Sequence, residues 1–131
     1  MKYLVVDDSA TMRRIVVNSL QRIGVTDIVE AGDGREALEK FDSANGAIGF
    51  LITDWNMPNM GGIDLAKAIR TRPGGKALPI LMVTARSVRE DIITALESEV
   101  NYYIVKPFTP AVLKEKIDAL LSPAPVAVAV G

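Results

Sequence analysis

Four short apolar runs of the sequence each end at side chains that could do chemistry. These side chains are the carboxylates of Asp7, Asp8 and Asp54, the hydroxyl of Thr84 and the ammonium of Lys106. Carboxylates that lie close together repel one another unless a positive charge joins them, and an all-oxygen ligand set suits a hard cation, Mg²⁺ before any transition metal. Each acid alone would be an ordinary surface charge, but the complementary set favours a metal site beside a hydroxyl and an ammonium.

The residue types that the chain lacks narrow the chemistry further. The sequence contains no cysteine and no histidine. A disulfide framework, a thiolate zinc site, a histidine-ligated metal and a Ser-His-Asp triad are therefore excluded, as is a phosphohistidine on this chain. Any chemistry must use carboxylates, hydroxyls, lysines and backbone groups.

The elements that must position these side chains can be read from the apolar pattern. Five strand-length runs, at residues 4–6, 28–31, 50–53, 80–83 and 102–105, lack the alternation of half-exposed strands, as expected in a parallel sheet buried on both faces. Helical stripes lie between them, the clearest being Met12, Ile15, Val16, Leu20 and Ile23, and Leu113, Ile117, Leu120 and Leu121. The alternation predicts an α/β fold with five helices, and it brings the chemical side chains to the carboxyl edge of the sheet.

Polar residues before the predicted helices have the spacing of N-caps. Asp33 with Glu36 and Ser87 with Glu90 have the spacing of capping boxes. Thr109 followed by a proline predicts a capped helix with proline in its first turn.

Length, composition and charge indicate one globular domain followed by a tail. With 131 residues, 49% of them hydrophobic, and a net charge of −1, the chain favours neither nucleic acid nor an anionic membrane as a partner. The apolar run near the N-terminus is too short for a signal peptide or a membrane span. We expect a domain over residues 1–121 and a low-complexity, disordered tail over 122–131. The alternative is that this tail is a truncated linker of a longer protein whose output module is absent.

Five stretches, in this order and at this spacing, resemble the receiver domains of two-component signalling, and most of all those of the chemotaxis type. They are LVVDD (4–8), TMRRIV (11–16), DWNMPNM (54–60), VTA (83–85) and VKPF (105–108), and the likeness runs from Lys2 to about Leu121. The resemblance implies a flavodoxin-like, doubly wound parallel sheet with strand order 2-1-3-4-5.

The resemblance also implies roles for the residues of the site. Asp54 would accept a phosphoryl group from a phosphohistidine. Asp8 and Asp54 would bind Mg²⁺, with Mn²⁺ as a substitute, through their side chains and Asn56 through its backbone carbonyl, while Asp7 would orient metal-bound water. Lys106 and Thr84 would hold phosphoryl oxygens. A cis peptide bond is implied between Lys106 and the proline that follows it.

A switch follows from the same resemblance. In the family that the chain resembles, the residue that matches Thr84 moves towards the phosphoryl group and vacates space for the aromatic residue that matches Tyr103. The face made by the fourth helix, the fifth strand and the fifth helix then changes its affinity for partners. Asn56 and Arg86 occupy positions that tune the lifetime of the phosphoryl group. Trp55 is expected to report metal binding or phosphorylation by its fluorescence.

The function that the resemblance implies is that of a stand-alone, cytoplasmic, monomeric response regulator. Its expected partners are a histidine kinase of the chemotaxis type and a flagellar-motor switch protein or a similar target. It would catalyse only its own phosphorylation and dephosphorylation, so it would not be an enzyme with turnover. The alternatives are a single-domain phosphorelay receiver of another pathway and the receiver half of a longer protein.

Rivals outside this family fit the residues less well. A haloacid-dehalogenase-like phosphatase needs a second acid where Asn56 stands. A flavodoxin-like cofactor carrier would need a phosphate-binding loop in place of Asp7 and Asp8. A binding module that no longer takes phosphate would not need the complete set of site residues.

Two positions depart from the family pattern. Gly61 stands where an acid or asparagine is common and should loosen the start of the third helix. Glu99 replaces a glycine that ends the fourth helix in a left-handed conformation, and a carboxylate is unfavourable beside the negative end of a helix. We therefore expect the fourth helix to be extended, frayed or displaced at its end.

Overall fold

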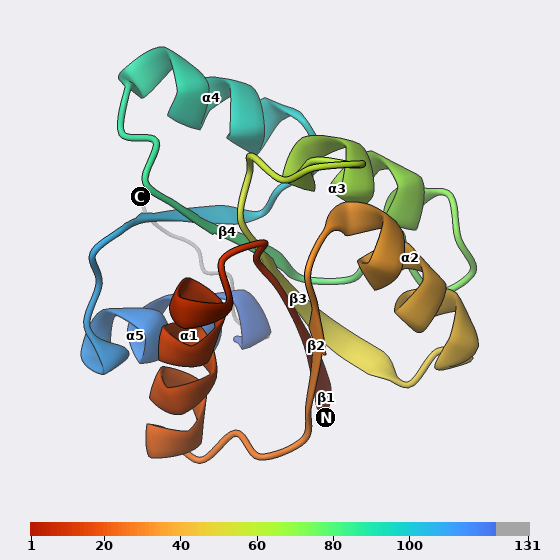
Figure 1. The fold of residues 1–131 in the computed structure, drawn as a ribbon, viewed down its shortest axis with the longest axis horizontal. Coiled ribbons are helices and arrows are strands. Elements are labelled where there is room, and N and C mark those ends of the chain that lie inside the picture. The colour runs from red at the N-terminus through yellow and green to blue at the C-terminus, as the bar shows by residue number, and fades with distance from the viewer. Residues whose placement is uncertain (123–131) are drawn as a thin grey trace.

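The computed structural model describes residues 1–122, in which strands and helices alternate along the chain (Figure 1). Apart from Ser122, the predicted tail lies outside the described residues. The elements are β1 Lys2–Val6, α1 Ala10–Arg22, β2 Ile28–Ala31, α2 Gly34–Ser43, β3 Ile48–Thr53, α3 Gly62–Arg70, β4 Ile80–Thr84, α4 Arg89–Glu97, β5 Tyr102–Val105 and α5 Pro110–Leu121. The predicted alternation of strands and helices is confirmed.

All neighbouring strands pair in parallel, in the order β2-β1-β3-β4-β5. The predicted doubly wound topology is therefore confirmed. The order reverses between β1 and β3, because β1 leads outward to β2 while β3 lies on its other side. Such a reversal creates a crevice at the carboxyl ends of the two strands, where open α/β sheets bind ligands.

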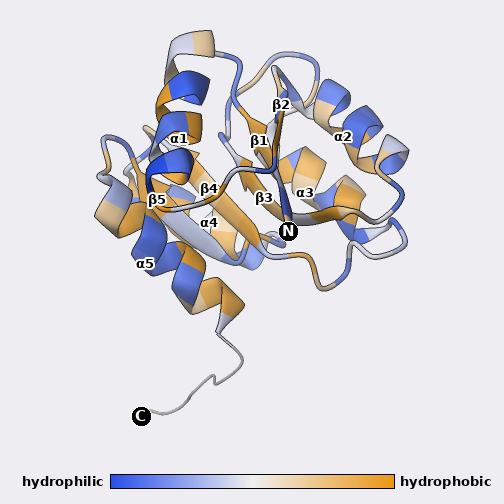
Figure 2. Ribbon diagram, turned by 90° about the horizontal axis from the view of Figure 1, so that it is seen from below, coloured by the Kyte–Doolittle hydropathy of each residue, from blue (hydrophilic) through white to orange (hydrophobic). Residues whose placement is uncertain are grey.

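Side chains of successive strand residues point to opposite faces of the sheet and form two apolar layers. Helices α1 and α5 cover one face, and α2, α3 and α4 cover the other (Figure 1). Figure 2 shows the hydrophobic strands between helices that carry both hydrophilic and hydrophobic residues. Tyr102 and Tyr103 illustrate the alternation, since Tyr102 packs with the α1/α5 layer and Tyr103 with the other.

The helix caps match the prediction at two of the three positions. The Asp33 side chain accepts a hydrogen bond from the backbone N–H of Glu36 at 2.8 Å, and Thr109 caps α5 with proline in the first turn. The Ser87 cap is wrong, because α4 starts after Val88, which makes no side-chain cap. The predicted stripe of α1 is also imperfect. Ile15 is exposed, and Val17 is buried instead.

The prediction for the end of α4 is wrong. The helix ends normally at Glu97 with Ser98 as its C-cap, and Glu99 adopts the left-handed conformation at φ 79°. The guanidinium of Arg70 explains this, because it donates to the Glu99 carbonyl at 2.8 Å and lies 3.6 Å from its carboxylate. A cation thus offsets both the backbone strain and the unfavourable negative charge.

Gly61 is the N-cap residue of α3 and offers no side chain to cap it. The expected loosening of this helix start stays a prediction. No helix within residues 1–122 is both long and apolar enough to cross a membrane.

Candidate functional site

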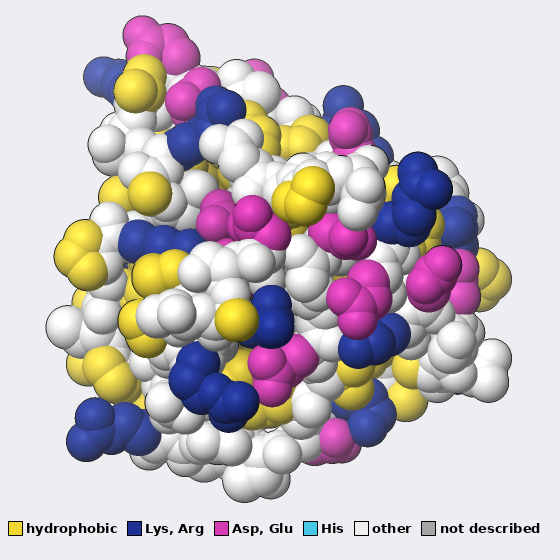
Figure 3. All heavy atoms as spheres, viewed as in Figure 1, with side chains coloured by type: hydrophobic (Ala, Val, Ile, Leu, Met, Phe, Trp, Pro, Cys, Tyr) yellow, Lys and Arg dark blue, Asp and Glu magenta, His cyan; other side chains and the backbone are white. Residues whose placement is uncertain are grey.

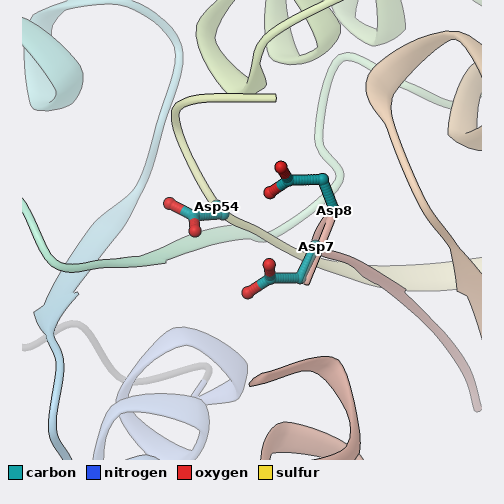
Figure 4. Close-up of side chains that lie close together, drawn as sticks. All are labelled: Asp7, Asp8 and Asp54. Atoms are coloured by element: carbon teal, nitrogen blue, oxygen red, sulfur yellow. The ribbon is translucent and has the colours of Figure 1, made fainter. Parts of the chain in front are cut away.

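The strand register brings the predicted acids together at the crevice between β1 and β3. Val6 pairs with Thr53 in the sheet, and the backbone N–H of Asp54 donates to the carbonyl of Val6 at 3.0 Å. Asp7 and Asp8 follow β1, and Asp54 follows β3, so the three side chains meet (Figure 4). Each offers one carboxylate oxygen within 4.8 Å of the others. Acidic side chains accordingly gather in the middle of the face seen in Figure 3.

The three carboxylates have different surroundings. Asp7 is buried, and its two oxygens accept hydrogen bonds from the backbone N–H of Ser9 at 2.9 Å and from Lys106 at 2.8 Å. Asp54 is half-buried and accepts from the backbone N–H of Trp55 at 2.6 Å. Asp8 is exposed and makes no side-chain hydrogen bond or ion pair with any residue in 1–122. Asp8 is therefore the acid with oxygens free of any donor, while both oxygens of Asp7 and both oxygens of Asp54 already accept hydrogen bonds.

Lys106 joins two of the acids. Thr84 pairs with Val105 in the sheet, which places Lys106 beside the end of β4, and its ammonium lies 2.8 Å from Asp7 and 3.1 Å from Asp54. Its side chain is only 9% exposed. Burial disfavours its charge, but the hydrogen bonds with the two carboxylates prevail and raise the pKa of Lys106. The peptide bond that precedes the next residue, Pro107, is cis, as predicted.

The two residues of the predicted switch are both buried. The Thr84 hydroxyl accepts a hydrogen bond from the backbone N–H of Arg86 at 3.4 Å. Tyr103 is 8% exposed and points inward, where its hydroxyl donates to the carbonyl of Arg86 at 2.8 Å. Burial, followed by the nearby carboxylate of Asp91, raises the pKa of Tyr103 to about 12. Thr84 and Tyr103 thus meet at the same residue of the loop that follows β4.

Arg86 closes one side of the site through contacts that the sequence pattern did not indicate. Its guanidinium donates to the Asn56 side chain and to Asp91, each at 3.1 Å. It also lies over the Trp55 ring, 4.4 Å from the centroid, in a cation–π contact. Asn56 and Arg86, the two residues expected to tune the lifetime of the phosphoryl group, are in direct contact, and the pair is linked to α4 through Asp91.

Arg13 is a second residue that sequence reasoning missed. Its guanidinium donates to the carbonyl oxygen of Asp7 at 2.5 Å and to the carboxylate of Glu30 at 3.0 Å. It thereby ties the turn that carries Asp7 and Asp8 to β2. The only available signal was its place in the stretch that resembles receivers, and spacing alone could not reveal the contact.

A pocket of about 420 Å³ opens beside the acids and is lined by Asp8, Trp55, Asn56, Met57, Pro58 and Gly61. Its donor set consists of carboxylate and amide or carbonyl oxygens, which fits Mg²⁺. Asp8, Asp54 and the carbonyl of Asn56 are the groups that could hold the ion. The ammonium of Lys106, 3.1 Å from Asp54, supplies a positive charge for an anionic group bound there.

The doubly wound sheet thus carries an acidic crevice and a strand-end lysine. The family model described as the response regulator receiver domain matches residues 3–118 of the chain. The chain belongs to this family.

Chemotaxis proteins are among the family members whose sequences are similar to this chain. The chain is 55% identical over 121 residues to "Chemotaxis protein CheY1" of Helicobacter pylori, covering 92% of this chain and 97% of the relative. It is 53% identical over 120 residues to "Chemotaxis protein CheY" of Pseudomonas aeruginosa, covering 92% and 95%. Among solved structures, chemotaxis protein CheY4 of Vibrio cholerae superposes with a TM-score of 0.83 at 37% identity, covering 92% and 98%. These likenesses support a role as a response regulator.

Proposed function

We propose that the protein is a response regulator that accepts a phosphoryl group on Asp54 and then changes a protein-binding face. The donor is a phosphohistidine of a chemotaxis-type kinase, and the target is a flagellar-motor switch protein or a similar partner. The protein acts as a cytoplasmic monomer. Its only catalysis is its own phosphorylation and dephosphorylation. The family and the chemotaxis relatives support this proposal.

One observation carries the chemistry of the proposal. The ammonium of Lys106 lies between Asp7 and Asp54, while Asp8 faces the pocket with its oxygens free. Asp54 therefore lies close to both a cation and a candidate metal ligand. Negative charge that builds on a phosphoryl group at Asp54 would be stabilised by Lys106 and by a cation held at Asp8.

The transfer is a displacement at phosphorus. One carboxylate oxygen of Asp54 forms a bond to phosphorus as the bond between phosphorus and the imidazole nitrogen breaks. The imidazole keeps the electron pair and takes a proton from water, and the product on Asp54 is an acyl phosphate. Lys106 stays beside the phosphoryl oxygens, and Thr84 supplies a hydroxyl when it turns towards them. Asp8, Asp54 and the Asn56 carbonyl would hold Mg²⁺, which would supply charge neutralisation and alignment.

The proposed output face consists of α4, β5 and α5. Ile93 and Leu96 on α4 and Val112 on α5 are exposed apolar residues there. Tyr103 of β5 is coupled to the site, because its hydroxyl donates a hydrogen bond to the carbonyl of Arg86 in the loop that follows β4. A change in that loop would therefore reach the face through Tyr103 and through α4.

Incubation of the full chain with Mg²⁺ and acetyl phosphate tests the proposal. We expect the mass of one phosphoryl group to be gained, the modification to map to Asp54, and the gain to disappear when Mg²⁺ is chelated. Asp54→Asn is the matched control, because it keeps the shape of the side chain and removes the nucleophile. No gain in the native chain, or an undiminished gain in the variant, would overturn the assignment.

A further inference from the structure

We infer that Arg86 is shared between Asp91 and the phosphoryl group on Asp54, so that phosphorylation draws its guanidinium away from helix α4. This inference rests on the proposed function, because it requires a phosphoryl group on Asp54. It adds an electrostatic link from the site to α4 that does not pass through Thr84 and Tyr103.

The contacts of Arg86 place it between the two regions. One guanidinium nitrogen donates to Asn56, which lines the pocket, and another donates to Asp91 in the first turn of α4. Its flat face lies on Trp55, the residue directly after Asp54. The loop that carries Arg86 runs from the end of β4 to α4 (Figure 1). The guanidinium therefore already lies beside the phosphorylation site while it is paired with α4.

A phosphoryl group is the stronger competitor for this guanidinium. Asp91 offers one negative charge, and both members of the pair are about one-third exposed, so that water weakens their attraction. A phosphoryl group adds about two negative charges and three strong acceptors, and the planar fork of arginine matches its oxygens. When the group appears on Asp54, the balance shifts from Asp91 towards the site.

Helix α4 has few stabilising contacts, so the loss of its ion pair with Arg86 should affect its stability. Ala95 is its only buried residue, and its N-cap, Val88, makes no side-chain hydrogen bond. Within residues 1–122, the pair with Arg86 is the only salt bridge of its first turn. Loss of the pair should loosen that turn, and the exposed Ile93 and Leu96 lie on the same helix.

A double-mutant cycle tests the exchange. Beryllium trifluoride, a tetrahedral mimic of the phosphoryl group, is titrated in excess Mg²⁺ by calorimetry into the native chain, Asp91→Asn, Arg86→Met and the double variant. We expect Asp91→Asn to tighten binding roughly two- to fivefold, the range of a partly exposed ion pair, and to have no such effect when Arg86 is methionine. Glu90→Gln is the matched control, because it removes the same charge from the same turn without an Arg86 contact.

Amide hydrogen exchange of residues 89–92 gives a second readout. Beryllium trifluoride should speed exchange there in the native chain, and Asp91→Asn should show fast exchange before any ligand is added. Equal tightening by Asp91→Asn in both Arg86 backgrounds, or exchange that does not respond, would overturn the inference. Failure of the native chain to become phosphorylated on Asp54 by acetyl phosphate is a different result, which would overturn the proposed function itself.

Discussion

The guanidinium of Arg70, at the end of α3, donates a hydrogen bond to the backbone carbonyl of Glu99, 2.8 Å away, in the loop between α4 and β5. The same guanidinium donates to the carbonyls of Gly75 and Leu78 and to the side chain of Asn101. One cation thus joins three segments at the end of the sheet opposite the site. A left-handed residue with a Cβ costs about 1–2 kcal/mol, which these contacts offset.

Replacement of Arg70 by methionine should lower the free energy of unfolding by about 2–4 kcal/mol. The side chain is mostly buried, and its loss leaves several carbonyl groups without their charged donor. Urea unfolding measures the change. Arg72→Met is the control, because Arg72 makes a more exposed pair with Asp42 and should cost less than about 1 kcal/mol. Equal losses in the two variants would contradict a special role for Arg70.

Replacement of Tyr103 by phenylalanine should change how stability depends on pH. The pKa of Tyr103 is raised from 10.0 to about 12 in the folded chain. The unfolded chain therefore loses this proton first, and the free energy of unfolding falls as pH rises from about 10 towards 12. In Tyr103→Phe this part of the decline should vanish, while the lost hydrogen bond to Arg86 costs about 0.5–1.5 kcal/mol at neutral pH.

Urea unfolding at a series of alkaline pH values gives the comparison. Tyr3 also has a raised pKa, chiefly because it is buried, so part of the decline should persist in the variant. A decline in Tyr103→Phe as steep as in the native chain would show that the phenol of Tyr103 does not resist ionisation in the fold.

The sequence allowed the positions of Asp7, Asp54, Thr84 and Lys106 to be predicted, because each lies at the carboxyl end of a buried strand whose register with its neighbour is fixed by parallel pairing. The place of a residue at the end of a strand depends only on its neighbours in the sequence. The contacts of a long side chain can involve distant residues, and Arg86 contacts Asn56, 30 positions away. For this reason neither its contact with Asn56 nor the contact of Arg13 with Glu30 could be predicted from spacing.

The end of α4 shows the opposite case, in which a local rule gave the wrong answer. The backbone preference of a residue with a Cβ disfavours the left-handed conformation at Glu99, and in an isolated helix this preference would decide the conformation. Arg70 lies 29 positions away in the sequence and reverses that preference. Tertiary contacts of this kind limit what residue-by-residue comparison with a family pattern can predict.

Replacement of Gly62 by alanine should be strongly destabilising and should disturb Asp54. A Cβ at Gly62 would lie 2.0 Å from the backbone carbonyl oxygen of Asp54, and backbone cannot move aside as a flexible side chain can. We expect a loss of more than about 3 kcal/mol in urea unfolding, in the range of severe overpacking. Gly61→Ala is the control, since its Cβ would lie 2.9 Å from the carbonyl oxygen of Trp55 and needs a smaller shift. Similar losses at both positions would contradict this explanation.

Replacement of Lys106 by methionine should separate cation binding from phosphorylation. Removal of a positive charge that lies 3.1 Å from Asp54 strengthens the field of the carboxylates, so Mg²⁺ should bind more tightly, by about tenfold. The same change removes the cation that stabilises the phosphoryl group, so phosphorylation by acetyl phosphate should fall at least a hundredfold. Trp55 fluorescence measures the first effect and protein mass the second. Loss of Mg²⁺ binding together with phosphorylation would mean that Lys106 only maintains the fold of the site.

Replacement of Arg13 by methionine should weaken Mg²⁺ binding by roughly tenfold, as expected for a residue that orients metal ligands. Its guanidinium holds the carbonyl of Asp7 and is itself neutralised by Glu30, so its main effect is on the geometry of the turn that carries Asp8. Arg14→Met is a sharp control, because Arg14 is exposed and its replacement removes the same charge. Charge alone predicts tighter binding in both variants, whereas positioning predicts weaker binding in Arg13→Met only. Fluorescence titration of Trp55 with Mg²⁺ distinguishes the two, and tighter binding in Arg13→Met would rule out a positioning role.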